Sequence, residues 1–226
     1  MKYDNIKKAV FIDRPNRFIA NVKIDGQPCV CHVKNTGRCC ELLTPGAEVY
    51  VHHTPSKTRK TDYDLVTVKK GHRLINMDSQ TANTLFREYV ESGRFLPGIT
   101  TLKPECYHGN SRFDFYYETE KSRGFVEVKG VTLEHDGVAS FPDAPTARGV
   151  RHLNGLINCI KNRFCAHIVF IIQMEDVKHF EPNDVIHKEF AETLKKAAAA
   201  GVKVTALCCR VTEDEVSVLH EVEVKL

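Results

Sequence analysis

The sequence predicts an α/β protein made of two parts, a small N-terminal β-barrel over residues 1–76 and an α/β domain with a central mixed sheet over residues 77–226. Up to residue 76, short apolar segments are separated by turn signals, whereas helical and strand patterns alternate after it. The net charge also changes sign at residue 76. The first part carries 14 Lys and Arg against seven Asp and Glu, and the second part carries 18 Lys and Arg against 22 Asp and Glu. A basic module beside an acidic one suits a nucleic-acid-holding surface next to a cation site, although ordinary surface charge produces the same asymmetry.

The N-terminal part is expected to be a barrel of the oligonucleotide-binding (OB) type. Its five expected strands cover residues 7–13, 17–25, 27–33, 47–54 and 62–70, with one helical turn near 39–43. Asp25-Gly26 is a hairpin signal, and Pro45-Gly46 marks a further turn. Five short strands with one helical turn are typical of OB barrels.

The second part should alternate helices with strands. Asp78 or Ser79 is expected to cap a helix that runs to Ser92, just before Gly93. Further helices are expected over 146–161 and 183–200, and strands over 112–119, 124–133, 166–173 and 202–211. This order predicts a mixed sheet packed between helices.

Composition excludes several classes of protein. With 42% hydrophobic and 27% charged residues the chain can bury a core, and no stretch approaches the ~18 apolar residues of a membrane span. The nine cysteines lack C-x-x-C spacing, so we expect reduced thiols in a cytoplasmic protein. A sugar-metabolising enzyme is disfavoured, since the chain has neither a glycine-rich nucleotide loop nor a tryptophan.

Two strand-like segments carry charges where strands usually carry apolar residues. Asp114 stands between two phenylalanines, and Glu127 and Lys129 alternate with valines. Side chains two apart on a strand share a face, so Glu127 and Lys129 point the same way and Asp114 can join them from the neighbouring strand. Two carboxylates with a backbone carbonyl, such as that of Val128, suit Mg²⁺ or Mn²⁺. The alternative is a cross-strand ion pair in a half-solvated hairpin.

The spacing of these three residues is that of the metal-dependent nuclease superfamily named for its PD-(D/E)xK motif, although Phe113 replaces the proline. Together with "SRFDF", "VEVKGVTL", "FPDAPTARGVRHL", "NTGR" and "AAAAGVKVTA", it resembles the sugar fermentation stimulation protein A family over nearly the whole chain. The resemblance implies an OB-like barrel joined to a PD-(D/E)xK nuclease-like domain. It also implies DNA binding and a link to the regulation of sugar (maltose) metabolism. The sequence departs from the family at Gly130, where serine is commoner, and at Lys34, where proline is expected.

Carried over to this chain, the resemblance implies that Asp114, Glu127 and Lys129 form the catalytic site, with Mg²⁺ or Mn²⁺ on the two acids. Glu88, on the preceding helix, is expected to be a further catalytic acid and metal ligand. Arg148 and His152 are four apart on a helix and share a face, which the resemblance places near the metal. Arg148 is then expected to meet a phosphate and His152 to carry a proton or donate to phosphate, whereas a surface pair is the alternative.

Nucleic-acid contacts are expected from polar and basic residues of the N-terminal part. They are Arg17, Asn35, Thr36, Arg38, Lys57, Arg59 and Lys60. A tight turn explains the Asn-Thr-Gly-Arg segment equally well, and the later lysines also suit a solvated loop. Two functions follow, a DNA-binding protein that cleaves phosphodiester bonds with a metal, or a DNA-binding regulator of sugar metabolism genes that performs no chemistry.

Overall fold

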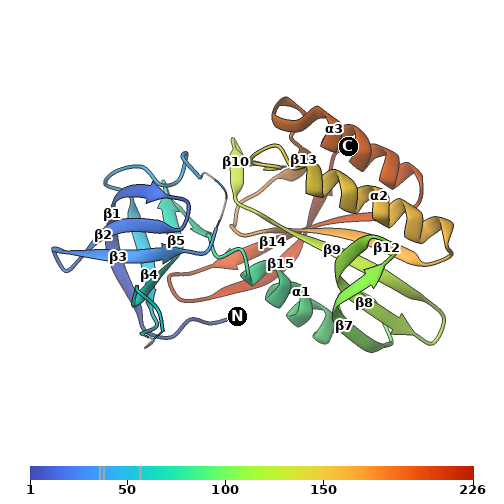
Figure 1. Ribbon diagram of the computed structural model, residues 1–226, viewed down its shortest axis with the longest axis horizontal. Helices are drawn as coiled ribbons and strands as arrows, with labels where there is room; N and C mark the ends of the chain where they lie inside the picture. The colour runs from blue at the N-terminus through green and yellow to red at the C-terminus, as the bar shows by residue number, and fades with distance from the viewer. Residues whose placement is uncertain (36, 38, 56–57) are drawn as a thin grey trace.

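The computed structural model describes residues 1–35, 37, 39–55 and 58–226, and it places a β-barrel beside a larger α/β domain (Figure 1). The barrel strands are β1 (Ile6–Asn16), β2 (Ile19–Ile24), β3 (Gln27–Val33), β4 (Glu48–His53), β5 (Tyr63–Lys70) and β6 (Arg73–Asn76). The sheet order is β3-β2-β1-β4-β5-β6, and a parallel pairing of β3 with β5 closes it. All five expected strands are therefore present, and a further strand, β6, pairs antiparallel with β5 at the edge of the sheet.

The second domain is built on a nine-stranded sheet. Its helices are α1 (Thr81–Glu91), α2 (Ala147–Lys161) and α3 (Asp184–Ala199). Its strands are β7 (Ile99–His108), β8 (Ser111–Thr119), β9 (Arg123–Val131), β10 (Leu133–His135), β11 (Val138–Phe141), β12 (Cys165–Ile172), β13 (His179–Pro182), β14 (Lys203–Val211) and β15 (Val216–Val224). The order is β10-β11-β13-β15-β14-β12-β9-β8-β7, with parallel β9, β12 and β14 at the centre. The predicted mixed α/β sheet is confirmed.

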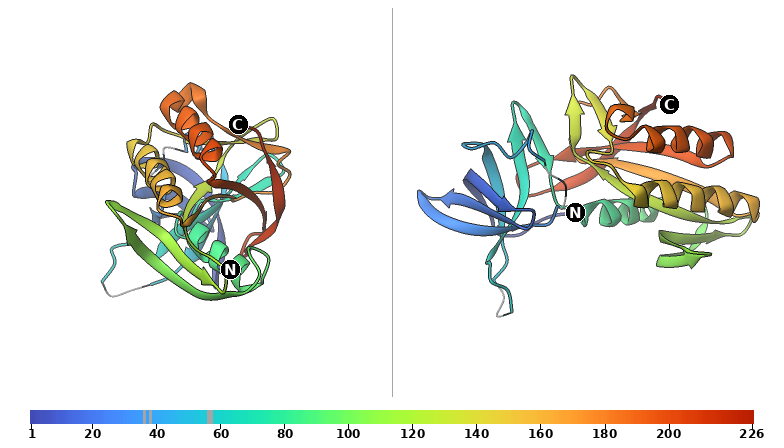
Figure 2. Two further views of the ribbon diagram at one scale, coloured as in Figure 1. Left: turned by 90° about the vertical axis from the view of Figure 1, so that its right-hand side faces the viewer. Right: turned by 45° about the horizontal axis from the view of Figure 1, so that its top comes forward.

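The helices cover opposite faces of this sheet (Figures 1 and 2). Leu153 and Leu156 of α2 and Phe190 of α3 belong to one buried cluster, whereas Leu85 and Phe86 of α1 belong to another. Buried residues run almost without interruption along the central strand β12 because both faces of the sheet are covered. The candidate site therefore lies in a strand layer that helices enclose from two sides.

Helix starts follow the capping signals in two cases out of three. Thr146 accepts a hydrogen bond from Gly149 N at 3.0 Å, and Asn183 accepts one from Ile186 N at 3.1 Å. The first helix begins later than expected, at Thr81, and its N-cap residue Gln80 makes no side-chain capping bond. Asp78 instead accepts from Gln80 N at 2.9 Å, so it shapes the turn that leads into the helix.

Polar contacts join the two domains. Glu134 of the second domain is buried and lies 3.2 Å from Nζ of Lys70 and 2.6 Å from Nη1 of Arg73, which come from β5 and β6. At the other end of the chain, Tyr3 N donates to Asp214 O at 2.7 Å, which holds the N-terminal segment against the second domain. No helix within the described residues is long and apolar enough to span a membrane.

Candidate metal site between diverging strands

Strand β8 changes direction at Asp114. Phe113 and Phe115 are two residues apart, yet they pack in different clusters on opposite faces of the sheet. The opposing residue in β7, Glu105, has a φ of 53°, in the left-handed region that twists a strand sharply. Pairing of β8 with β9 ends at Phe115 and Val126, so the two strands separate beyond that point. The carboxylate of Asp114 therefore lies in the gap between them.

Asp114 is held from two sides in this gap. Its Oδ2 accepts a hydrogen bond from Val128 N at 2.8 Å, and its Oδ1 accepts one from Asn83 Nδ2 of α1 at 3.2 Å. The N–H and C=O of a strand residue point to the same side, so the Val128 carbonyl is directed toward the same gap. Asn83 is not predictable from the sequence, because it lies outside the apolar stripe of α1 and belongs to no recognisable motif.

Glu127 is the buried member of the site, with 1% of its surface exposed. Its Oε1 accepts from Lys129 Nζ and is hydrogen-bonded to Nδ1 of His152 on α2. Burial alone would raise the pKa of Glu127, but these two partners outweigh it and hold the pKa below its ordinary value. Glu127 therefore stays ionised at neutral pH, with Lys129 and His152 beside it as expected.

The acid pair is electrostatically strained. Burial raises the pKa of Asp114 above its ordinary value, the negative charge of Glu127 raises it further, and the Val128 N–H only partly offsets them. Oε2 of Glu127 is buried and has no hydrogen-bond partner among the residues that the structure describes. A hard divalent cation would satisfy this oxygen and relieve the repulsion, so Asp114, Glu127 and the Val128 carbonyl fit such an ion chemically.

Replacing Asp114 by asparagine is expected to stabilise the metal-free protein at neutral pH. Because the folded state raises the pKa of Asp114, the stability linked to this group is present at acid pH and is lost as the pH rises through the folded pKa. An asparagine side chain cannot ionise, so D114N should melt a few degrees higher at pH 7 in EDTA, and its advantage should vanish toward pH 4. Thermal melts across this range, with the exposed D25N as control, measure the effect. A constant difference at every pH would contradict it.

Glu88 does not join the acid pair, which corrects the expectation that it is a third ligand. Its Oε2 lies 2.9 Å from the N-terminal ammonium of Met1, and its side chain is 44% exposed. The buried stripe of α1 faces the sheet, so Glu88 faces away from the gap between β8 and β9. Within the described residues, no cluster of three or more His, Cys, Asp or Glu is placed to hold a metal ion.

Arg148 and His152 share a face of α2, as their spacing predicts. Nε of Arg148 donates to Nε2 of His152 at 3.4 Å, while Nδ1 of His152 contacts Glu127. An imidazole that accepts at Nε2 carries its proton on Nδ1 and donates it to the carboxylate. Arg148 itself is exposed, so its guanidinium can also reach a ligand outside the site.

The expected nucleic-acid contacts are dispersed over the barrel. Arg17 is exposed at the β1–β2 turn with its guanidinium 4.9 Å from the centre of the Phe18 ring, and Lys60 is exposed in the loop before β5. Asn35 forms the tight turn, since its Oδ1 accepts from Gly37 N at 2.8 Å. Arg59 instead pairs with the buried Asp64 of β5. Thr36, Arg38 and Lys57 lie outside the described residues.

The fold and the site together define a class of two-domain proteins in which an OB-type barrel precedes a mixed-sheet α/β domain that carries an acid pair and a lysine. Family models support both halves: the "SfsA N-terminal OB domain" matches residues 12–77, and the "Sugar fermentation stimulation protein RE domain" matches residues 80–215. The chain belongs to the sugar fermentation stimulation protein family. The expected family and fold are thereby confirmed.

Similar proteins span the full chain. Sugar fermentation stimulation protein homologs from Clostridium beijerinckii and Ruminiclostridium cellulolyticum are 54% and 52% identical to it over 226 residues, which is 100% of each chain. The solved structure of Pyrococcus furiosus SfsA in complex with Ca²⁺ matches with a TM-score of 0.91 and 30% identity, and the match covers 100% of this chain and 98% of that one.

Proposed function

We propose that this protein binds DNA and cleaves phosphodiester bonds with Mg²⁺ or Mn²⁺ held by Asp114 and Glu127. The observation that carries the proposal is the unpartnered, buried Oε2 of Glu127 beside the destabilised carboxylate of Asp114. In a DNA-binding protein, two neighbouring carboxylates would repel the phosphates of the DNA unless a bound cation neutralised them. The Pyrococcus furiosus relative was solved with Ca²⁺, another hard cation with oxygen ligands, which supports this choice of metal.

The bound metal would polarise a phosphate and lower the pKa of a water molecule. Lys129 then has two tasks, to neutralise Glu127 in the resting site and to stabilise negative charge that develops on the phosphate. His152 holds Oε1 of Glu127 from α2 and so orients the carboxylate. Arg148, exposed on the same helix, would contact a neighbouring phosphate.

A second candidate function is a DNA-binding regulator of sugar metabolism that retains this fold without chemistry. It is favoured by the mutual contacts of Glu127, Lys129 and His152, which form a satisfied ion-pair network on Oε1. Incubation of the purified protein with single- and double-stranded DNA, in Mg²⁺, Mn²⁺ or EDTA, separates the two. Metal-dependent shortening of the DNA supports the enzyme, and stable binding without product supports the regulator.

DNA affinity is expected to fall steeply with salt, because phosphate contacts release roughly 0.9 counterions for each duplex phosphate neutralised. The double variant R17A/K60A should lower the slope of log affinity against log salt by roughly one unit for each contact removed. Fluorescence anisotropy at several salt concentrations measures the slope. The variant K188A/K195A removes two exposed charges from α3 and should leave it unchanged. Equal slopes for wild type and R17A/K60A would show that Arg17 and Lys60 do not contact the DNA phosphates.

A further inference from the structure

A polar cavity of about 150 Å³ lies between the loop after β3 and the end of the sheet. Its walls include Ser79 before α1, Gly130 and Thr132 at the end of β9, Ser140 of β11 and Gln173 after β12. We call this cavity the junction pocket. Gly130 directly follows Lys129, so the pocket lies at the end of the strand that carries Glu127 and Lys129.

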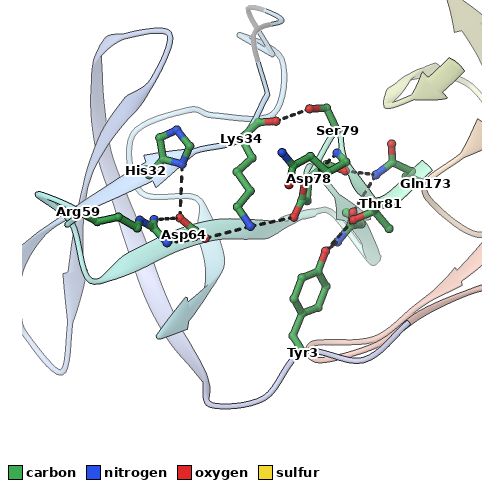
Figure 3. A network of polar contacts seen from close by, with 11 residues as sticks. Tyr3, His32, Lys34, Arg59, Asp64, Asp78, Ser79, Thr81 and Gln173 are labelled. Atoms are coloured by element: carbon green, nitrogen blue, oxygen red, sulfur yellow. Dashed lines mark hydrogen bonds and ion pairs between the residues drawn. The ribbon is translucent and has the colours of Figure 1, made fainter. Parts of the chain in front are cut away.

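Gln173 presents an acceptor to the junction pocket. Its Nε2 donates to Asn76 Oδ1 at 2.7 Å and to the carbonyl oxygen of Asp78 at 3.1 Å (Figure 3). A carbonyl only accepts, so these bonds fix the amide orientation and leave Oε1 on the side of Gly130. A Cβ at position 130 would lie 2.5 Å from this oxygen. Among the described residues, Oε1 of Gln173 accepts no hydrogen bond.

The wall that holds Gln173 is fixed by a charged network across the domain junction (Figure 3). Lys34 Nζ lies 3.0 Å from Asp64 Oδ2 and 3.4 Å from Asp78 Oδ2, and Asp64 is also held by Arg59. Asp64 and Asp78 are both almost fully buried. A polar group held by buried, satisfied partners is pre-organised, so it binds a ligand without the entropic cost of ordering.

The remaining polar lining is also rich in acceptors. Asp143 lines the pocket and is exposed at its rim, and the hydroxyls of Ser140 and Thr132 accept as well as donate. Phe141 is half-buried against Phe170 and Phe190 and adds an apolar wall. The cavity is smaller than the roughly 300–1,000 Å³ of sites for drug-sized ligands, so it suits one small group rich in N–H donors.

We propose that the junction pocket binds a single unpaired nucleobase of the nucleic acid, read through its N–H donors by Gln173 and Asp143. The inference deepens the proposed function and rests on it, because the base would belong to the strand whose phosphate lies at Asp114 and Glu127. Guanine offers two adjacent N–H donors on its Watson–Crick edge, whereas thymine offers one between two acceptors, so guanine is the preferred base.

Binding of free nucleosides to the full, metal-free chain tests this proposal without any cleavage. Deoxyguanosine should bind at least tenfold more tightly than thymidine in an NMR titration. G130A should weaken deoxyguanosine binding at least tenfold, because the added Cβ displaces Gln173 Oε1. D143N should abolish the preference for deoxyguanosine, since an amide no longer accepts at both positions. D136N, the same change at an exposed site outside the pocket, should have no effect.

Three outcomes would overturn the proposal: no saturable binding of deoxyguanosine, equal binding of both nucleosides, or wild-type binding by both G130A and D143N. K129A separates this proposal from the proposed function, because Lys129 lies outside the pocket lining. Selective deoxyguanosine binding by wild type and K129A, in a protein that cleaves no DNA, would support the pocket and reject the nuclease. Cleavage without selective nucleoside binding would support the nuclease and reject the pocket.

Discussion

The variant K129A is expected to lose metal-dependent DNA cleavage by at least ~10²-fold, the size of effect seen when a single electrostatic stabiliser is removed from an active site. Lys129 contacts Glu127 directly, and its side chain is 18% exposed, so it can meet a substrate phosphate. Its loss removes stabilisation of the charge that develops in the transition state. DNA affinity should change little, because the proposal assigns most phosphate contacts to the exposed basic residues of the barrel.

Cleavage and binding should be measured in parallel on single- and double-stranded DNA, in Mg²⁺ and in Mn²⁺. K161A is the matched control, because this lysine ends α2 on the exposed surface. Equal cleavage by wild type and K129A would assign the activity to another site or to a contaminant. Tight binding by both proteins without product would favour the regulator.

Mn²⁺ is expected to raise the melting temperature of the wild-type protein, because an ion that binds only the folded state stabilises it by mass action. At 100 times its dissociation constant this amounts to ~2.7 kcal/mol, or roughly 5–11 °C for a chain of this size. D114N and E127Q should each lose most of this response, since each removes one of the two carboxylates. Melts with Mn²⁺ and with EDTA give the difference for each variant.

Glu88 supplies the matched control for this experiment. It is an exposed acid paired with the N-terminal ammonium, so E88Q should keep the full response to Mn²⁺. An equal metal response in wild type, D114N and E127Q would show that the acid pair is only structural. If E88Q instead lost the rise in melting temperature with Mn²⁺, Glu88 would be a metal ligand.

Much of the fold is predictable from local patterns, but the sheet edges are not. The capping residues Thr146 and Asn183 predict the starts of α2 and α3, and the five barrel strands follow from their alternation and turns. Strand β7 has no such signal, because it contains Pro104 and no buried residue. An edge strand tolerates proline, since its outer N–H groups need no partner in the sheet.

Only the residues of the site that are close together in the sequence can be predicted from it. Glu127 and Lys129 share a face because they are two apart on one strand, and Asp114 could be placed beside them from the expected strand pairing. Which residue of α1 faces Asp114 depends on how the helix packs, and the structure selects Asn83 rather than Glu88. The network from Asp64 to Asp78 joins residues of both domains, so no spacing rule could reveal it.

A crystal structure of the protein soaked in millimolar Mn²⁺ tests the central claim most directly, because the anomalous signal locates the ion. We expect an anomalous peak between Asp114 and Glu127, in contact with Oε2 of Glu127, which has no hydrogen-bond partner among the described residues. Glu127 should keep its contacts with Lys129 and His152 through the other oxygen. No peak at this position, with the two carboxylates directed apart, would contradict the metal site.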